Sequence, residues 1–490
     1  MDRPRNLLFI VADQFRADLL KGSLAAAVET SNLDRLARRS EVYLDHHTVT
    51  VPCGPARASL LTGQYAMTHR VTHNGAPLGH RHPNLASELR KLGLEPLLFG
   101  YNDVQPDPSG LHRNDPAHRS YTQPLRGFTE VQEMRDEAWS WLAHLRSRGY
   151  DVPDAESDDF DALYRPLDGI LGNPALYHAE DSDTAFLTDR VIWQLDVRKS
   201  RPWAAMVNYI RPHPPLVAPA PYHALIPTEA VPKPVQNATD HPFFSAFHSA
   251  PTGNGLFYGF NGRMDALLPD TTALLRRTYL GLVEELDHHI GRLLDWLEAT
   301  DQSDNTMVIF TADHAEMLGD LGTWGKITPF RQASHIPLIV QSPGGPDREV
   351  DNLTRSIDVV PTILETFGAE IPNQMAGRPL RSQEPSEDIE PVSDAAMLDG
   401  VMIEVELGGP DGAGRFESAW DQPMHACRAA IWQTTAYRYV HFACDQPPML
   451  FDTKTDPSCT TDIALERADL VTELQRGLLN HRIQNAAVEF

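Results

Sequence analysis

Short apolar runs alternate with helical patterns along the first three quarters of the chain. Four of these runs end in polar residues or are followed by them: "LLFIVAD", "EPLLFGY", "WAAMVNYI" and "TMVIFTAD". The stretches "SNLDRLARRS" and "LASELRKLG" are predicted helices, and from about 271 to 299 apolar residues recur on one face of a longer helix. Strands that are apolar on both faces and separated by helices predict an α/β fold, with a mostly parallel sheet covered by helices on both sides.

Three other regions depart from this alternation. Residues from about 102 to 180 and from about 214 to 268 are rich in Pro, Asp, His and Gly, which is typical of long loops or insertions that carry substrate specificity. After about residue 375 the pattern changes to "YRYVHFA" and "MLFDT", followed by the helical "DLVTELQRGLLNHR". The sequence therefore predicts a catalytic domain over 1–375. A smaller α+β domain over 376–490 would contain an antiparallel sheet and a terminal helix.

The composition is that of a globular protein with a strong acidic excess. Of 490 residues, 42 are Lys or Arg and 67 are Asp or Glu, which gives a formal net charge of −25. Such a surface repels nucleic acid and anionic membranes, so we expect neither as a partner, and an anionic substrate would need local positive charge. Four cysteines without a C-x-x-C pair, no signal-peptide pattern and no long apolar run predict a cytoplasmic protein.

Carboxylates follow two separate strand-like runs. "FIVADQ" ends in Asp13 and Gln14, and "FTADHAE" contains Asp313 and His314. Ligands bind beyond the carboxyl ends of strands in open α/β sheets, so these side chains are candidates for one site. A set of oxygen ligands with one imidazole suits Ca²⁺, Mn²⁺ or Mg²⁺ better than Zn²⁺. The alternative for either Asp alone, capping of the next helix, is the commoner role of such a residue.

The stretch "TVPCGPARASLLTG" places a scarce cysteine beside a helix start. Pro55 suits the first helical turn and Gly63 suits the helix end, so Cys53 is predicted just before the N-terminus, where free N–H groups favour an anion. Arg57 adds a positive charge at the same end. Three interpretations compete: a buried small hydrophobe, a thiolate nucleophile, and a cysteine that is modified before it works. The three residues between Cys53 and Arg57 are too few for the loop of a cysteine phosphatase.

These motifs carry a family resemblance that extends over nearly the whole chain. "C-G-P-A-R" matches the C-x-P-x-R signature of type I sulfatases, and "FIVADQ", "TADHAE" and "WGK" occupy the expected flanking places. "VPCGPARASLLTG" and "YIRPHPPLVAPAPYHA" are most similar to the phosphonate monoester hydrolase and arylsulfatase branch of the alkaline phosphatase superfamily. The resemblance implies an alkaline-phosphatase-like fold. It also implies that a converting enzyme turns Cys53 into Cα-formylglycine.

The resemblance further implies a role for each matching residue. One divalent metal ion would be bound by Asp13, Gln14, the modified Cys53, Asp313 and His314. Arg57 would hold the hydrated aldehyde. Lys326 in "LGTWGK" and His213 in "YIRPHPP" would contact the transferred group, with His213 protonating the leaving oxygen.

Three more residues match positions near the substrate. Asn74 and Tyr101 would lie near its anionic oxygens, although Asn74 before glycine is also a turn signal and Tyr101 could be part of the core. Asp103 stands where this branch often has threonine, and its carboxylate would repel an anion or bind a cationic part of the substrate. The spacing of Lys326 alone would favour a solvated surface lysine.

The implied activity is hydrolysis of small anionic esters, namely aryl sulfates, phosphonate monoesters or both. Two alternatives remain at this stage. Phosphonate or phosphodiester hydrolysis could be the main activity with sulfatase activity secondary, or the chain could be a non-catalytic binding protein on the same fold. Relatives in this branch imply a homo-oligomer, either a dimer or a tetramer.

Overall fold

An eight-stranded sheet forms the centre of the protein in a computed structural model, which describes residues 3–115, 118, 122–135, 138–152, 163–251, 255–264, 267–383, 400–409 and 414–486. The strand order is β11-β2-β10-β9-β1-β8-β5-β7, and β10 alone in this sheet runs antiparallel to its neighbours. The bounds are β1 Asn6–Ala12, β2 Glu41–His47, β5 Pro96–Gly100, β7 Thr129–Glu133, β8 Ala204–Tyr209, β9 Thr306–Ala312, β10 Leu338–Gln341 and β11 Arg348–Arg355. The predicted fold class is confirmed.

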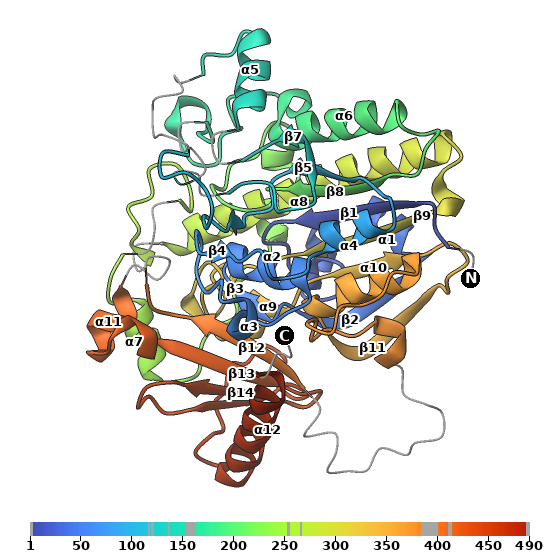
Figure 1. Cartoon of the computed structure of the whole chain (residues 1–490). Helices are drawn as coiled ribbons and strands as arrows, with labels where there is room; N and C mark the ends of the chain where they lie inside the picture. Colours follow the sequence, from blue (N-terminus) through green and yellow to red (C-terminus); the bar gives the residue numbers. More distant parts are fainter. Residues whose placement is uncertain are drawn as a thin grey trace.

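Helices cover both faces of this sheet (Figure 1). Strand β1 shows why, because Leu8 and Ile10 join one hydrophobic cluster while Leu7 and Phe9 join another on the opposite face. The first cluster contains residues of α1 Ser31–Ala37, α5 Trp139–Ser147, α6 Asp183–Asp196 and α8 Pro269–Ala299. The second contains residues of α2 Cys53–Thr62, α4 Leu85–Lys91 and α10 Val359–Phe367.

The predicted insertions contain regular structure. The first holds β6 Gln105–Pro106, which pairs with β4 Pro77–Leu78, as well as α5 and β7. Strand β7 is the edge strand of the central sheet, so the prediction of loops was wrong there. Its sequence "TEVQE" is only half buried and has no apolar run to reveal it. The second region holds α7 Pro242–Phe247, and parts of both regions lie outside the described residues.

A second sheet has the order β15-β14-β13-β12-β3. Strands β12 Val401–Glu406, β13 Arg428–Gln433, β14 Tyr437–Phe442 and β15 Met449–Asp452 pair antiparallel, as predicted for the C-terminal region. The short β3 Thr50–Val51 joins them by pairing parallel with β12. The segment that leads into Cys53 is therefore anchored on the C-terminal sheet.

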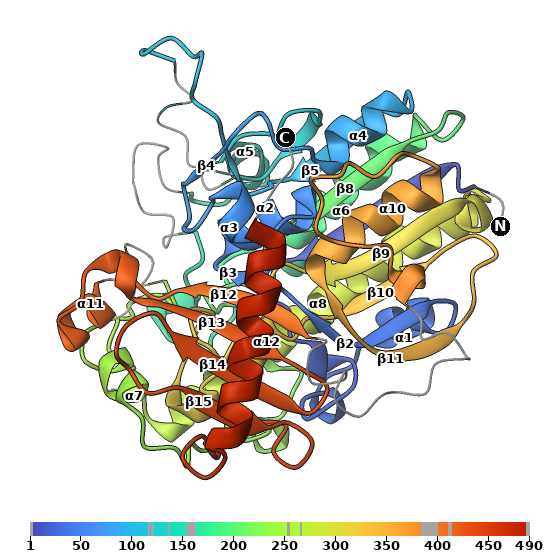
Figure 2. The ribbon, with the colours of Figure 1, turned by 60° about the horizontal axis from the view of Figure 1, so that its bottom comes forward.

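Helix α12 Ala468–Ala486 lies across the second sheet (Figure 2) and buries Leu470, Leu474 and Leu478 against it. The remaining helices are α3 Ala66–His69, α9 Arg331–Ser334 and α11 Arg415–Trp420. The proposed domain boundary near 375 stays a prediction, and residues 384–399 beyond it lie outside the described part. Within the described residues, every helix is too short or too polar to cross a bilayer.

Candidate active site

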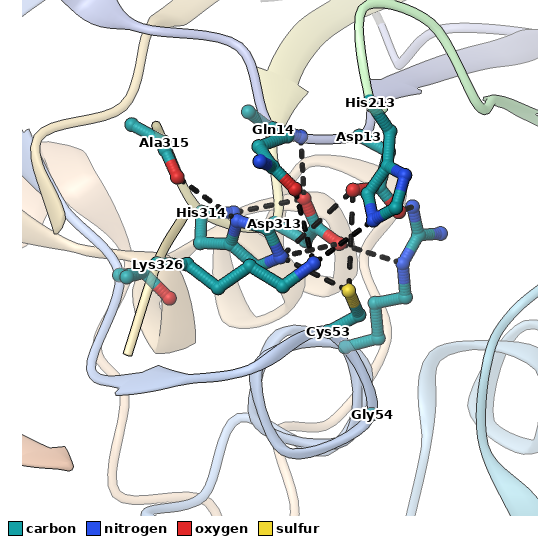
Figure 3. Close-up of polar contacts among 12 residues, drawn as sticks. Asp13, Gln14, Cys53, Gly54, His213, Asp313, His314, Ala315 and Lys326 are labelled. Carbon is teal, nitrogen blue, oxygen red and sulfur yellow. Dashed lines mark hydrogen bonds and ion pairs between the residues drawn. The ribbon is translucent and has the colours of Figure 1, made fainter. Parts of the chain in front are cut away.

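The two predicted strand ends converge at one edge of the central sheet. Strands β1 and β9 are adjacent and parallel, with Ala12 opposite Ala312, so Asp13 and Asp313 leave the sheet side by side. Helix α2 brings Cys53 to the same place. One ligand atom from each of four buried residues lies within 4.8 Å of the others (Figure 3), and these residues are Asp13, Cys53, Asp313 and His314.

Arg57 fixes both carboxylates from the first turns of α2. Its Nε donates to Asp313 Oδ2 at 2.9 Å and its NH2 donates to Asp13 Oδ2 at 3.1 Å. Its NH1 donates to Asn208 Oδ1 at 2.9 Å, and the Tyr101 hydroxyl donates to Asp13 Oδ2 at 2.5 Å. The guanidinium is fully buried and paired on each side, which favours one fixed geometry.

The start of α2 differs slightly from the prediction, because Cys53 is the first helical residue and Pro52 is the N-cap. Gly54 follows Cys53, and its backbone N–H donates to Asn74 Oδ1 at 2.8 Å. Helix α2 ends as predicted, with Gly63 in the left-handed region at φ 65°. Residue 53 is therefore held at a helix N-terminus, which favours negative charge.

Gln14 is fixed at all four of its polar atoms. Its backbone has φ 68°, its N–H donates to Asp313 Oδ1 at 3.1 Å, and its carbonyl oxygen accepts from the Tyr279 hydroxyl at 2.7 Å. Its side-chain nitrogen donates to Glu316, and its Oε1 accepts from Lys326 Nζ at 3.0 Å. These contacts orient the Gln14 amide so that its oxygen faces the Lys326 side of the site. An amide oxygen is an atom that can ligate a metal.

Glu316 and Asn208 are site residues that the sequence analysis missed. Glu316 is buried, and besides the Gln14 amide it accepts from the backbone N–H of Leu318 at 3.1 Å and of Gly325 at 2.5 Å. It therefore anchors the loop that presents Lys326. Its position two residues after His314 in "TADHAE" is the sequence feature that could have identified it. Asn208 gave no signal, because it lies inside an otherwise apolar strand.

Lys326 and His213 form a pair above residue 53. Lys326 Nζ lies 2.9 Å from His213 Nε2, and Arg211 donates to the backbone carbonyl of His213 at 2.8 Å. Burial and the charge of Lys326 lower the pKa of His213 to about 4. Its imidazole is therefore neutral near pH 7 and accepts from the ammonium. His213 Nδ1 lies against the carbonyl of Pro214.

The cluster fits a divalent cation. Burial and the charge of neighbouring Asp13 raise the pKa of Asp313. A bound cation would offset both effects by stabilising the ionised carboxylate. His314 Nδ1 lies 3.1 Å from the carbonyl of Ala315, so its Nε2 lone pair is left to face the cluster, as in a metal-ligating histidine. Two carboxylates, one amide oxygen and one imidazole around residue 53 suit Ca²⁺ or Mn²⁺, with Mg²⁺ also compatible.

The three predicted substrate-binding residues border the cluster in different ways. Tyr101 bonds to Asp13, and its ring lies 4.4 Å from the Arg57 guanidinium carbon, so its contacts are to the site's framework. Asn74 uses its oxygen at the start of α2. Asp103 is 6% exposed with φ 50°, and its carbonyl oxygen lies 3.1 Å from where a Cβ on Gly54 would stand. Their substrate roles stay predictions.

Comparison with known proteins identifies the family. The Sulfatase family profile matches residues 5–369. The phosphonate monoester hydrolase SpPMH from Silicibacter pomeroyi superposes with a TM-score of 0.89 at 42% identity, covering 98% of this chain and 95% of its own. The phosphonate monoester hydrolase of Agrobacterium radiobacter gives 0.89 at 33% identity, covering 99% and 96%.

A curated relative matches over a similar length. The multifunctional alkaline phosphatase superfamily protein PehA of Trinickia caryophylli is 33% identical over 98% of this chain and 96% of its own length. A choline-sulfatase of Rhizobium meliloti (strain 1021) is 26% identical over 94% and 82%. The chain thus belongs to the sulfatase family of hydrolases, within the alkaline phosphatase superfamily, and is close to its phosphonate monoester hydrolases.

Proposed function

We propose that the protein hydrolyses phosphonate monoesters, and more slowly aryl sulfates, through a covalent ester on Cα-formylglycine at position 53. The observation that carries the proposal is the position of Cys53 Sγ, which marks where the modified residue's oxygens would lie. It stands 3.1 Å from His314 Nε2 and 4.0 Å from Asp13 Oδ1, at the start of α2. The 42% identity to a phosphonate monoester hydrolase supports this order of substrates.

An unmodified thiol is a poor candidate for the nucleophile. Burial and the adjacent Asp13 raise the pKa of the Cys53 thiol well above its usual value, which disfavours the thiolate. Formylglycine in its hydrated form offers two hydroxyls. One oxygen attacks phosphorus or sulfur and displaces the leaving alcohol. The second hydroxyl then loses its proton and expels phosphonate or sulfate, which regenerates the aldehyde. A serine ester has no such second hydroxyl.

The cation would be held by Asp13, Gln14, Asp313 and His314 together with residue 53. When bound, it supplies Lewis-acid polarisation of the ester and of the nucleophile. Arg57 keeps both carboxylates pointing inward during the reaction, because it pairs with one oxygen of each.

Lys326 and His213 lie beside residue 53, where they would supply positive charge and a proton. Burial opposes the charge on Lys326, but nearby Asp13 and Asp313 outweigh it and raise its pKa, so it stays an ammonium. His213 is neutral in the free site and receives a hydrogen bond from that ammonium. We infer that the Lys326 ammonium donates the proton to the leaving oxygen, and that His213 Nε2 orients this ammonium by accepting one of its N–H groups.

Peptide mass spectrometry and parallel kinetics test the proposal. Protein co-expressed with a formylglycine-generating enzyme should carry a residue 53 lighter than cysteine by about 18 Da, as expected for this oxidation of the side chain. Activity should rise with the converted fraction. Full activity in protein whose Cys53 is unmodified would overturn the formylglycine mechanism.

The ranking of three substrates decides among the remaining activities. We expect kcat/KM to be highest for 4-nitrophenyl phenylphosphonate, lower for bis(4-nitrophenyl) phosphate and lower still for 4-nitrophenyl sulfate. A reversed order would make sulfate or diester hydrolysis the main activity. A non-catalytic binding role is disfavoured because the complete predicted set of ligands, Arg57, His213 and Lys326 is present.

We also propose that the enzyme works in the cytoplasm, which suits its four free cysteines.

A further inference from the structure

A groove of about 590 Å³ lies between α12, the second sheet and the segment around α3, away from the catalytic cluster. Figure 2 shows α12 crossing the strands β12, β13 and β14 at this place. None of the residues that form the metal-site cluster lines it. The volume lies within the range of about 300–1,000 Å³ that is usual for small-molecule sites.

The groove exists because its floor is made of small side chains. Ala430 on β13, Ala66 on α3 and Ala443 after β14 all line it, where larger residues would fill the space beside α12. Leu478 packs against the sheet and lines the groove, and its neighbour Leu479 lines it while remaining 55% exposed. The groove therefore presents apolar surface that is open to solvent.

The rim carries an excess of positive charge in a protein of net charge −25. Two carboxylates line the groove, and both are engaged: Glu406 pairs with Arg428 at 2.7 Å, and Glu404 accepts from the backbone N–H of Met67 at 3.0 Å. Four guanidinium groups line it, from Arg70, Arg428, Arg476 and Arg482. The side chains of Arg70 and Arg476 make no hydrogen bond or ion pair with a described residue.

We propose that this groove binds an amphipathic organic anion, with its apolar body on the alanine floor and a sulfonate, carboxylate or phosphonate head among the rim arginines. Charge complementarity selects the head, because arginine binds planar and tetrahedral anions through paired N–H donors. The apolar floor selects a carbon body and gives inorganic anions little to contact. The inference rests on the groove alone and holds whether or not the proposed reaction is correct.

The probe that tests this site is 8-anilinonaphthalene-1-sulfonate, an aromatic sulfonate whose fluorescence rises in apolar surroundings. We expect one strong site per chain. The double variant Arg476→Glu/Arg482→Glu should weaken it about tenfold or more, since hydrogen bonds to charged groups are lost and repulsion is added. Ala430→Leu should weaken it by filling the floor while leaving the melting temperature near that of the wild type.

Two controls separate this site from the rest of the molecule. Arg201→Glu makes one such charge reversal at an exposed position outside the groove and should leave probe affinity unchanged. Lys326→Ala should also leave it unchanged, because that residue belongs to the catalytic cluster. Unaltered probe binding in the groove variants, or loss of binding in Lys326→Ala, would overturn the proposal.

A second copy of the chain is the competing occupant, and sedimentation distinguishes it. If the wild type sediments as an oligomer that Arg476→Glu/Arg482→Glu dissociates, and the probe binds only the dissociated form, the groove is a subunit interface and the small-molecule proposal fails. We expect instead that these substitutions change probe affinity and leave the sedimentation coefficient unchanged.

Discussion

The catalytic cluster and the α12 groove both place arginine side chains in an acidic protein, yet they are built in opposite ways. In the cluster, the Arg57 guanidinium is fully buried and bonds Asp13, Asp313 and Asn208. In the groove, the side chains of Arg70 and Arg476 bond to no described residue. Fixed charges need no reorganisation when charge develops in a reaction, which suits catalysis. Exposed arginines without a fixed partner among the described residues lose conformational entropy on binding, which suits weaker and more tolerant recognition.

The two regions are physically connected. Strand β3 lines the groove through Thr50 and leads directly to Cys53. Helix α3 lines the groove through Ala66 and Met67, and its His69 Nε2 lies 2.8 Å from the Ser59 hydroxyl of α2. A ligand in the groove therefore touches elements that carry residue 53.

The largest expected effect comes from Cys53→Ala. Removing the proposed nucleophile should lower kcat by a factor on the order of 10⁴ or more, as nucleophile deletions do elsewhere. Affinity of the groove for 8-anilinonaphthalene-1-sulfonate should not change. A steady-state assay of 4-nitrophenyl phenylphosphonate and a fluorescence titration of the same preparation measure both. A variant that kept substantial turnover would show that residue 53 is not the nucleophile.

The pairing of Gln14 with Glu316 can be broken and then restored. Glu316→Gln would turn its amide nitrogen toward Gln14, which would have to rotate and point its own nitrogen at the cluster. We expect metal affinity and kcat/KM to fall about 10- to 100-fold, as is usual for residues that orient metal ligands.

Exchanging the two residues provides the matched control. In Gln14→Glu/Glu316→Gln, the new carboxylate would accept from the new amide and keep an oxygen on the cluster, so most of the lost affinity should return. Mn²⁺ titration by calorimetry measures this independently of turnover. If the double variant binds Mn²⁺ no better than Glu316→Gln, Glu316 acts only as a structural support for its loop.

Asp103 is expected to affect the selectivity between substrates, by a smaller factor than the effects predicted above for Cys53 and Glu316. Its φ of 50° suits Asp or Asn and disfavours a β-branched residue, so Asp103→Asn is a better test than the threonine of related enzymes. Removing this carboxylate near residue 53 should favour dianionic 4-nitrophenyl phosphate over the monoanionic phosphonate ester about fivefold, because like-charge repulsion scales with substrate charge. The ratio of kcat/KM values gives the answer. An equal loss on both substrates together with loss of Mn²⁺ would place Asp103 among the metal ligands.

How far the sequence predicts each region follows from the kind of contact that builds it. Strands β1, β8 and β9 were predictable because they are continuously apolar, and Asp13 and Asp313 because they end two of these strands. Asn208 and Glu316 act through partners 151 and 302 residues away in sequence, which no local pattern encodes. The groove depends on alanines from separate elements meeting beside α12, so only the packed structure reveals it.

The last predicted effect is on stability and not on activity, and it concerns His69, which joins α3 to α2. Burial lowers its pKa to about 3, and its Nδ1 accepts from the backbone N–H of Val71 at 3.1 Å, so the folded protein holds it neutral. The unfolded chain binds a proton below about pH 6.5, so acid favours unfolding through this residue. The penalty is absent at pH 7.5 and grows as the pH falls toward the folded pKa. At pH 5 it is about 2 kcal/mol, from roughly 1.4 kcal/mol for each pH unit below 6.5.

His69→Gln removes this proton while keeping a donor for Ser59. Urea unfolding at both pH values should show that the variant loses about 2 kcal/mol less stability than the wild type between pH 7.5 and pH 5. The variant should be less stable at pH 7.5, because the acceptor for Val71 is lost. Equal losses on acidification would mean that His69 is already protonated in the fold, with the Ser59 hydroxyl accepting and the Val71 contact broken. In that case the link between the groove wall and the catalytic helix would be charged, and acid would not loosen it.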